Sequence, residues 1–278
     1  MAKLRYKLVT DEPRDAARLI DRFFLYIDIL GFADLVMNSP DRVADLYEIV
    51  SSLNAHRHGS FGTIVFSDTI LIYPKFKSGI GKQADSYFIM YLCEFAQDLM
   101  YRMRNRDIYF RAVITQGKFT HYILNNIPCF YGPALVDAYN SEKKIKAVGL
   151  FIDSRCALKS TLFHTQPFND KYDYVHLWQS MEIFQPHGVY AFPYPDPSSF
   201  EEEDYQWELA RDALIFSNIA RNRNHPDPDV GEKHRNTWDL LYNRYPKVLG
   251  QLEAANFDPR VFCPGMDWSE SIKRAKLD

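Results

Sequence analysis

The sequence predicts an α+β protein with a mainly antiparallel sheet flanked by helices, followed by a C-terminal helical extension. The first observation is the order of hydrophobic patterns, which reads strand, helix, two strands, helix, strand, helix, strand. The second is a change after about residue 195, where Pro- and Asp-rich stretches separate amphipathic helices. The third is a hydrophobic content of 46%, with 15% aromatic residues, which supports a full core. We therefore expect one large α+β domain over residues 1–195 and a helical extension over residues 196–278.

The first expected strand is the segment RFFLYIDILGF, residues 22–32, because nearly every side chain in it is apolar. A helix over residues 39–53 follows, where Ser39 can cap the start and Pro40 suits the first turn. Helical spacing gives this helix an apolar face made of Val43, Leu46, Tyr47, Val50 and Leu53.

Two apolar, β-branched runs within residues 62–76 are joined by Ser67-Asp68, which predicts a tight hairpin. A long helix is expected over residues 82–106, and its apolar stripe consists of Phe88, Tyr91, Leu92, Phe95 and Leu99. Residues 108–120 should then form a strand that ends near Gly117. These elements supply the centre of the antiparallel sheet.

The next helix is expected over residues 131–149, opened by Gly132-Pro133 and closed at Gly149. Later strands are expected at residues 150–156, 172–185 and 189–194. The extension should contribute amphipathic helices at residues 206–224 and 233–255.

Charge, apolar runs and cysteine spacing exclude several classes of binding partner. The formal net charge of −3 argues against nucleic acid or a membrane surface as the partner. No apolar run approaches the ~20 residues of a membrane span, and the N-terminal segment lacks the apolar stretch of a secretory signal. The cysteines show no CxxC spacing, so we expect reduced thiols in a cytoplasmic protein and no zinc site.

Two acids stand out against this background. Asp28 lies within the first buried-strand pattern, where a lone carboxylate is costly unless it has a partner. Asp68 lies at the hairpin turn and is the candidate to face it. Close carboxylates repel unless a cation separates them, and carboxylates with phosphate oxygens are usual Mg²⁺ ligands. Two alternatives stay open: Asp68 as an ordinary turn aspartate, and Asp28 as a buried acid paired with an arginine.

Arg111 opens the strand segment RAVITQG. It can cap the preceding helix or pair with a surface acid. It can also bind phosphate, for which the guanidinium fork is well suited.

Four motifs occur in a fixed order: YIDILGF, FSD, RAVITQG and YGPALVDAY. Together they resemble the class III nucleotidyl cyclase family over roughly residues 20–190, which implies a ferredoxin-like cyclase domain. The resemblance implies that Asp28, Ile29 and Asp68 bind two Mg²⁺ or Mn²⁺ ions per active site. It also implies that Ile29, Gly31 and Phe32 contact the triphosphate, as does Arg111, six residues before Gly117.

The chain departs from the family's purine cyclases at the base-reading positions. Gly62 stands where they carry a lysine, Cys129 where they carry a polar residue, and Tyr131 replaces a tryptophan. Asn140 occupies the place of the family's transition-state arginine, so either catalysis is slower or another cation substitutes. Tyr139, beside it, is expected to contact substrate.

The pattern GPALVDAY..E is most similar to the bacterial pyrimidine cyclases of the Pycsar anti-phage systems. Glu142 shares an otherwise apolar helix face with Leu135, Ala138 and Tyr139, so it should need a partner; the alternative is a boundary glutamate in solvent. Tyr47 is a candidate wall of a pocket that fits a pyrimidine, with a core tyrosine as the alternative.

The resemblance implies a uridylate cyclase that converts UTP to cyclic UMP in anti-phage defence. The alternatives are a cytidylate cyclase, an adenylyl or guanylyl cyclase, and a domain that senses nucleotides without catalysis. The implied partners are a nucleoside triphosphate, a second copy in a head-to-tail homodimer with interfacial active sites, and a separate effector protein that the product activates.

Overall fold

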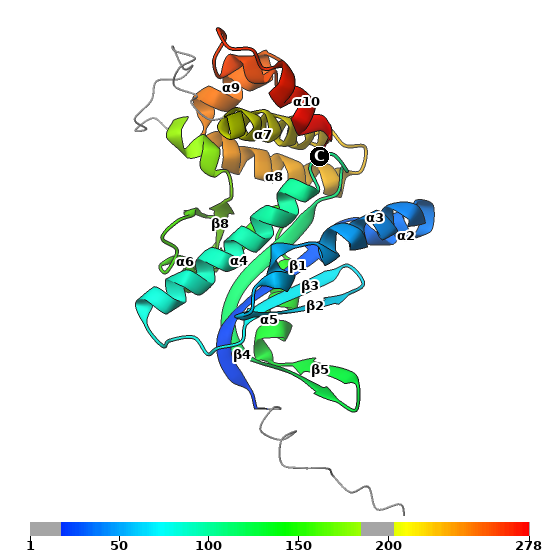
Figure 1. Cartoon of the computed structure of the whole chain (residues 1–278), viewed down its shortest axis with the longest axis vertical. Helices are drawn as coiled ribbons and strands as arrows, with labels where there is room; N and C mark the ends of the chain where they lie inside the picture. The colour runs from blue at the N-terminus through cyan, green and yellow to red at the C-terminus, as the bar shows by residue number, and fades with distance from the viewer. Residues whose placement is uncertain (1–17, 185–202, 278) are drawn as a thin grey trace, which may run out of the picture.

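A single eight-stranded sheet organises the chain in a computed structural model that describes residues 18–184 and 203–277 (Figure 1). The strand order is β2-β3-β1-β4-β6-β8-β7, with β5 paired to β4, and β4 with β6 is the parallel pair among these antiparallel neighbours. The strands are β1 Ile20–Ile29, β2 Phe61–Phe66, β3 Thr69–Pro74, β4 Phe110–Leu124, β5 Ile127–Tyr131, β6 Gly149–Asp153, β7 His164–Pro167 and β8 Tyr172–His176.

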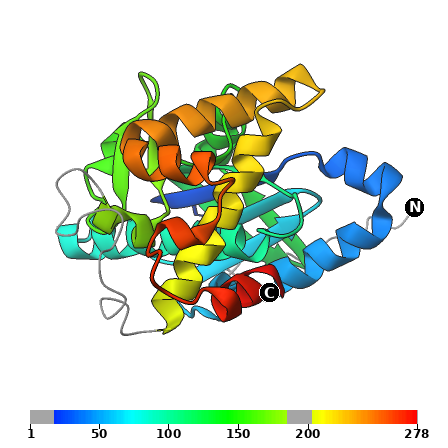
Figure 2. The same cartoon turned by 90° about the horizontal axis from the view of Figure 1, so that it is seen from above.

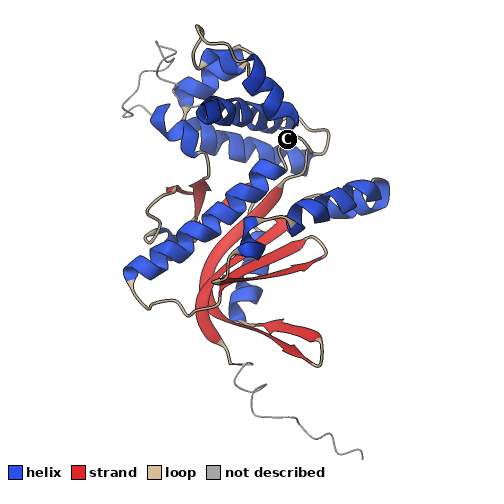
Figure 3. Cartoon of the chain, viewed as in Figure 1, coloured by secondary structure: helices blue, strands red, loops and turns tan. Residues whose placement is uncertain are grey.

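Helices flank the sheet and build the C-terminal region, which confirms the predicted α+β class (Figure 3). Those of the first part are α2 Phe32–Asn38, α3 Pro40–Ser51, α4 Lys82–Arg102, α5 Pro133–Glu142 and α6 Ser154–Ala157. Those of the C-terminal region are α7 Glu203–Asn222, α8 Pro228–Arg244, α9 Pro246–Ala254 and α10 Ser269–Leu277. Short 3₁₀ turns lie at Asn54–Arg57, Gln179–Phe184 and Pro259–Val261.

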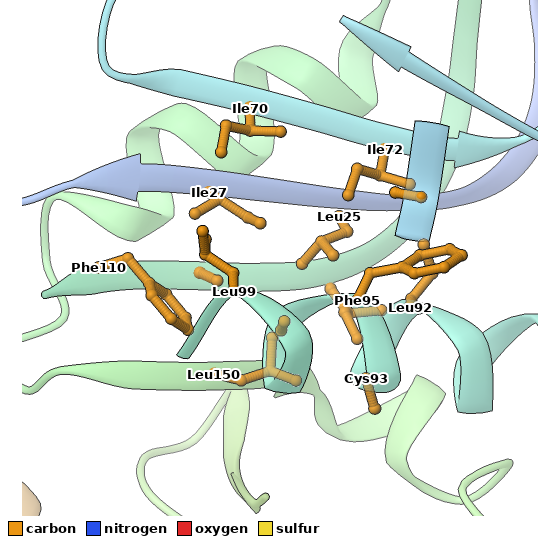
Figure 4. Packing of buried hydrophobic residues seen from close by; sticks show 14 of the residues in the cluster. Leu25, Ile27, Ile70, Ile72, Leu92, Cys93, Phe95, Leu99, Phe110 and Leu150 are labelled. Carbon is orange, nitrogen blue, oxygen red and sulfur yellow. The ribbon is translucent and has the colours of Figure 1, made fainter. Parts of the chain in front are cut away.

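Alternation along β1 sends its side chains to two different cores. Leu25 and Ile27 pack against α4, together with the apolar stripe predicted for that helix (Figure 4). Phe24 and Tyr26 point to the opposite face, where α5 packs. Asp28 shares the parity of Tyr26, so its carboxylate lies on the α5 side of the sheet.

The C-terminal helices cover the same side of the sheet farther along, over β4, β6 and β8. Val113, Phe151 and Tyr174 from these strands share one apolar cluster with residues of α7, α8 and α9. Figure 1 shows this helical region at one end of the molecule, and Figure 2 looks down on it. The predicted boundary at residue 195 lies outside the described residues, so the division into two domains stays a prediction.

Several predicted elements differ in length. β4 continues past Gly117 to Leu124 and turns at Asn125-Asn126, whose φ values of 49° and 67° suit a hairpin, into the unpredicted strand β5. α5 ends at Glu142 instead of Gly149. The predicted strand over residues 172–185 ends at His176, and the strand predicted at 189–194 lies outside the described residues.

The helices show similar differences. The predicted helix over residues 233–255 is two helices, α8 and α9, because Pro246 cannot continue the first and instead starts the second. Ser39 precedes α3 but makes no capping hydrogen bond through its side chain. The strand expected at residues 150–156 ends at Asp153, where α6 begins, and the elements α2, α6, β7 and α10 were not predicted. Among the helices of residues 18–184 and 203–277, none has the length and apolar character needed to cross a membrane.

Candidate active site

Asp28 and Asp68 come together at one end of the sheet. Asp28 is the penultimate residue of β1 and lies opposite Thr69, the first residue of β3. The main-chain N–H of Ile29 donates to the carbonyl of Asp68 at 2.9 Å. The hairpin turn is therefore hydrogen-bonded directly to the end of β1. This bond places Asp68 next to Asp28, as expected from the sequence.

The turn that carries Asp68 is held from α3. Ser67 adopts a φ of 52°, which is uncommon for a residue with a side chain and allows the tight connection. The Tyr47 hydroxyl donates to the Ser67 carbonyl at 3.0 Å, and its ring lies edge-on to Phe32. Tyr47 is 40% exposed, so it is not a core tyrosine, and its hydroxyl is bound to the turn.

Arg111 lies opposite Asp28 on the neighbouring strand β4. Its Nη2 is 3.9 Å from Asp28 Oδ2, too far for a hydrogen bond. Its Nε and Nη2 contact Glu142 Oε1, and Nη1 donates to the carbonyl of Ile145 at 2.6 Å. Glu142 is buried, so the expectation that it needs a partner is confirmed and the solvent alternative is wrong.

Negative charge exceeds positive charge around Asp28. Burial, followed by the charges of Glu142 and Asp68, raises the pKa of Asp28 to about 7, against the opposing pull of Arg111. Asp28 thus lies near two further carboxylates and one guanidinium. A divalent cation beside Asp28 would offset this excess.

The donor set suits Mg²⁺ or Mn²⁺. Both acids offer hard oxygen ligands, and the Ile29 side chain is buried facing α4, so Ile29 can contribute only its main-chain carbonyl. Within residues 18–184 and 203–277, no group of three His, Cys, Asp or Glu side chains could hold an ion. One or two carboxylates completed by water and phosphate oxygens is the usual arrangement for Mg²⁺, so the residues present fit that ion.

The turn after Asp28 changes the direction of the chain. Gly31 has a φ of 74°, a left-handed conformation that glycine adopts at low cost, and α2 starts at Phe32. The backbone of Gly31 and Phe32 thus follows Asp28 and Ile29 at the same end of the sheet.

The α5 candidates lie near this face but differ in their contacts. Tyr139 lies edge-on to Tyr26, two residues before Asp28 on β1, and Lys143 Nζ lies 3.8 Å above its ring. Asn140 is exposed on the same helix.

Cys129 and Tyr131 lie on the β4–β5 hairpin, on either side of Phe130. Both lie on β5, where Tyr131 pairs with Thr120 of β4. Phe130, which lies between them, has its ring centroid 5.6 Å from that of Phe66, the residue just before the Ser67-Asp68 turn, so β5 packs beside that turn within one chain.

The pairing of Arg111 with Glu142 was not predicted. The signal that could have found it is that a strand arginine and a glutamate on an apolar helix face both need buried partners. The role of the Tyr47 hydroxyl in holding Ser67 left no signal in the sequence.

No family model and no curated protein matches this chain. Solved structures do resemble it. The guanylyl cyclase domain of the RhoGC fusion protein from the aquatic fungus Blastocladiella emersonii is 18% identical, with a TM-score of 0.46 over 56% of this chain and 95% of that one. The guanylate cyclase domain of RhGC from Catenaria anguillulae, solved with GTP, is 16% identical, with a TM-score of 0.46 over 58% and 98%. The adenylyl cyclase CyaB from P. aeruginosa is 10% identical, with a TM-score of 0.42 over 57% and 95%. Likeness at this level carries no weight for activity.

Proposed function

We propose that this protein is a nucleotidyl cyclase that converts UTP to 3′,5′-cyclic UMP and pyrophosphate. The observation that carries the proposal is the juxtaposition of Asp28 and Asp68, joined by the hydrogen bond from Ile29 to the Asp68 carbonyl. Two acids with surplus negative charge at the edge of a sheet are suited to hold divalent cations between protein and phosphates.

In this proposal Asp28, Asp68 and the main chain of Ile29 hold two Mg²⁺ or Mn²⁺ ions. When bound, the ions lower the pKa of the ribose 3′-hydroxyl and offset charge on the phosphates. The 3′-oxygen bonds to the α-phosphorus, the bond from that phosphorus to the bridging oxygen breaks, pyrophosphate leaves, and water takes the hydroxyl proton. The backbone of Gly31 and Phe32 lines the phosphates.

The choice of a pyrimidine rests on the sequence, in which Gly62 stands where the purine cyclases carry a lysine. A Cβ at this glycine would lie 2.4 Å from the Tyr73 ring, and the Tyr73 hydroxyl shares a 2.6 Å hydrogen bond with His121. A long purine-reading side chain has no room there. UTP is placed before CTP because the sequence resembles uridylate members more closely, and cytidylate cyclase is the second candidate.

Assembly into a head-to-tail homodimer is part of the proposal. Val136 on α5 is 59% exposed, and Ile123 and Ile127 in the β4–β5 hairpin are 70% and 62% exposed. Such apolar side chains favour a covered surface. A second copy is also the route by which Asn140 would join an Asp28 site. The product would then act as a second messenger for a separate effector in anti-phage defence.

The test is to incubate purified protein with ATP, GTP, CTP or UTP and Mn²⁺, and to identify products by mass. We expect cyclic UMP with one pyrophosphate per cyclic nucleotide. Cyclic CMP as the main product would favour the second candidate. Cyclic AMP or GMP would contradict pyrimidine choice, and no cyclic product from any nucleotide would contradict the cyclase.

A further inference from the structure

Arg111 and Glu142 form a buried ion pair beside Asp28. Arg111 is 7% exposed and Glu142 is 2% exposed. The guanidinium is held at three points, with Nε and Nη2 on Glu142 and Nη1 on the carbonyl of Ile145. Three of its five N–H groups are used in this way, so a ligand that drew the guanidinium aside would break buried contacts.

The same guanidinium stops just short of Asp28. Its Nη2 lies 3.9 Å from Asp28 Oδ2, although the two residues are direct partners across β1 and β4. Asp28 keeps 22% of its side chain exposed, so its oxygens remain accessible. Asp28 and Arg111 thus form only a long ion pair, while Glu142, which also lies beside Asp28, takes the hydrogen bonds of the guanidinium.

We propose that Glu142 is a positioning residue of the metal site: by binding Arg111 it keeps the guanidinium off Asp28, which leaves that carboxylate open to a divalent ion. The inference rests on the proposed function, because it assumes that Asp28 is a metal ligand. It differs from the family-derived expectation that Arg111 binds the triphosphate.

Two physical reasons support it. If Glu142 were absent, Asp28 would be the nearest acid, and the planar arginine fork readily closes on a carboxylate. A metal ion would then have to displace a buried arginine. If instead a phosphate drew Arg111 away, Glu142 would remain buried without a cation, which is strongly unfavourable.

The lysines beside α5 bind elsewhere and do not compete for this role. Lys171 binds Asp137 and Ser141 on the outer part of the helix, and Lys143 lies over the Tyr139 ring. Lys171→Gln is thus a matched control, because it removes an ion pair of the same helix away from Asp28.

The experiment titrates Mn²⁺ alone into each protein and measures free Mn²⁺ by electron paramagnetic resonance, without nucleotide. We expect Glu142→Gln to weaken binding by about tenfold or more, as loss of a residue that orients a metal ligand commonly does. Adding Arg111→Gln to that variant removes the competing guanidinium, so the double variant should return close to wild type. Lys171→Gln should bind as wild type, and Asp28→Asn should lose the site.

Recovery of Mn²⁺ affinity in the double variant is the decisive result. If each substitution only damaged the fold, the two losses of affinity would add instead of cancelling. Unchanged Mn²⁺ affinity in Glu142→Gln, or a double variant as weak as the single one, would overturn the inference. An Mn²⁺ affinity of Asp28→Asn equal to that of the wild-type protein would overturn the inference as well. If Glu142→Gln does not fold, Glu142→Asp replaces it, because its shorter reach lets the guanidinium shift toward Asp28. If all variants bind Mn²⁺ as expected but the wild-type protein forms no cyclic nucleotide, the proposed function is wrong and the role of Glu142 at the metal site is still supported.

Discussion

Asp28 and Arg111 are direct neighbours across β1 and β4, yet their closest charged atoms are 3.9 Å apart and the arginine is bound elsewhere. This separation makes a long ion pair without a hydrogen bond, so the alternative of Asp28 paired with an arginine holds in that form. Here the acid stays accessible and has a second acid, Asp68, at its side. The Asp28 carboxylate therefore remains available for a ligand.

The first prediction concerns metal dependence. Removing the Asp68 carboxylate in Asp68→Ala, or chelating metal with EDTA, should reduce cyclic nucleotide formation by about a hundredfold or more. The variant should stay folded, because one of two repelling acids has been removed. Turnover is measured by product mass and folding by thermal melting. Near-normal turnover in Asp68→Ala would remove the two-acid metal site from the account.

The second prediction concerns shared sites in a dimer. Asp68→Ala removes a proposed metal ligand, and Tyr139→Ala changes α5. In the proposed dimer, α5 of one protomer completes the active site of the other. Mixing the two inactive proteins should restore activity, because mixed dimers contain one intact site. Subunit exchange is verified with differently tagged chains. If exchange occurs and activity does not return, the two sets of residues do not act across an interface.

The third prediction concerns base choice. Tyr47→Ala shortens a half-exposed wall beside the Asp68 turn, so ATP turnover should rise relative to UTP turnover. Tyr47→Phe is the matched control: it keeps the ring and loses only the hydrogen bond to Ser67. Its substrate preference should match wild type. A wild-type preference for ATP, or an equal change in both variants, would contradict the steric account.

Much of this site was foreseeable from the chain alone. The apolar run around Asp28 and the two β-branched runs around Asp68 are strong local signals, and sheet pairing turns them into neighbours. Glu142 was also identifiable, because a glutamate on an apolar helix face must find a partner.

The missed parts depend on long-range contacts. Which cation meets Glu142 is decided by how α5 packs on β4, a contact between residues 31 positions apart. The extension of β4 beyond Gly117 depends on pairing with β5, and Tyr47 meets Ser67 only once α3 packs beside the hairpin. The spacing of residues within one element does not determine which distant element packs against it.

The fourth prediction concerns stability against acid. His176 on β8 is buried against Tyr174 and Tyr245, and burial, then the charges of His164 and Arg244, lower the pKa of His176 to about 3. Its ordinary pKa is 6.5, so the unfolded chain binds the proton first and stability falls as pH drops below that value. From about pH 7 to about pH 5 this histidine should cost about 2 kcal/mol of unfolding free energy.

In His176→Gln that loss should disappear from urea unfolding curves measured at the two pH values. His234, whose pKa burial lowers to about 4, acts in the same direction, so the variant should flatten the pH dependence only in part. A pH dependence identical to wild type would show that His176 is not held neutral between β8 and the C-terminal helices.

The most direct test of the central claim is to locate manganese in crystals grown with Mn²⁺ and a UTP analogue that cannot cyclise. Anomalous scattering identifies the ions independently of the protein. The account predicts two peaks beside the triphosphate, with carboxylate oxygens of both Asp28 and Asp68 at roughly 2.1 Å and Arg111 still on Glu142. Peaks that touch neither acid, or an analogue bound away from the end of β1, would contradict it.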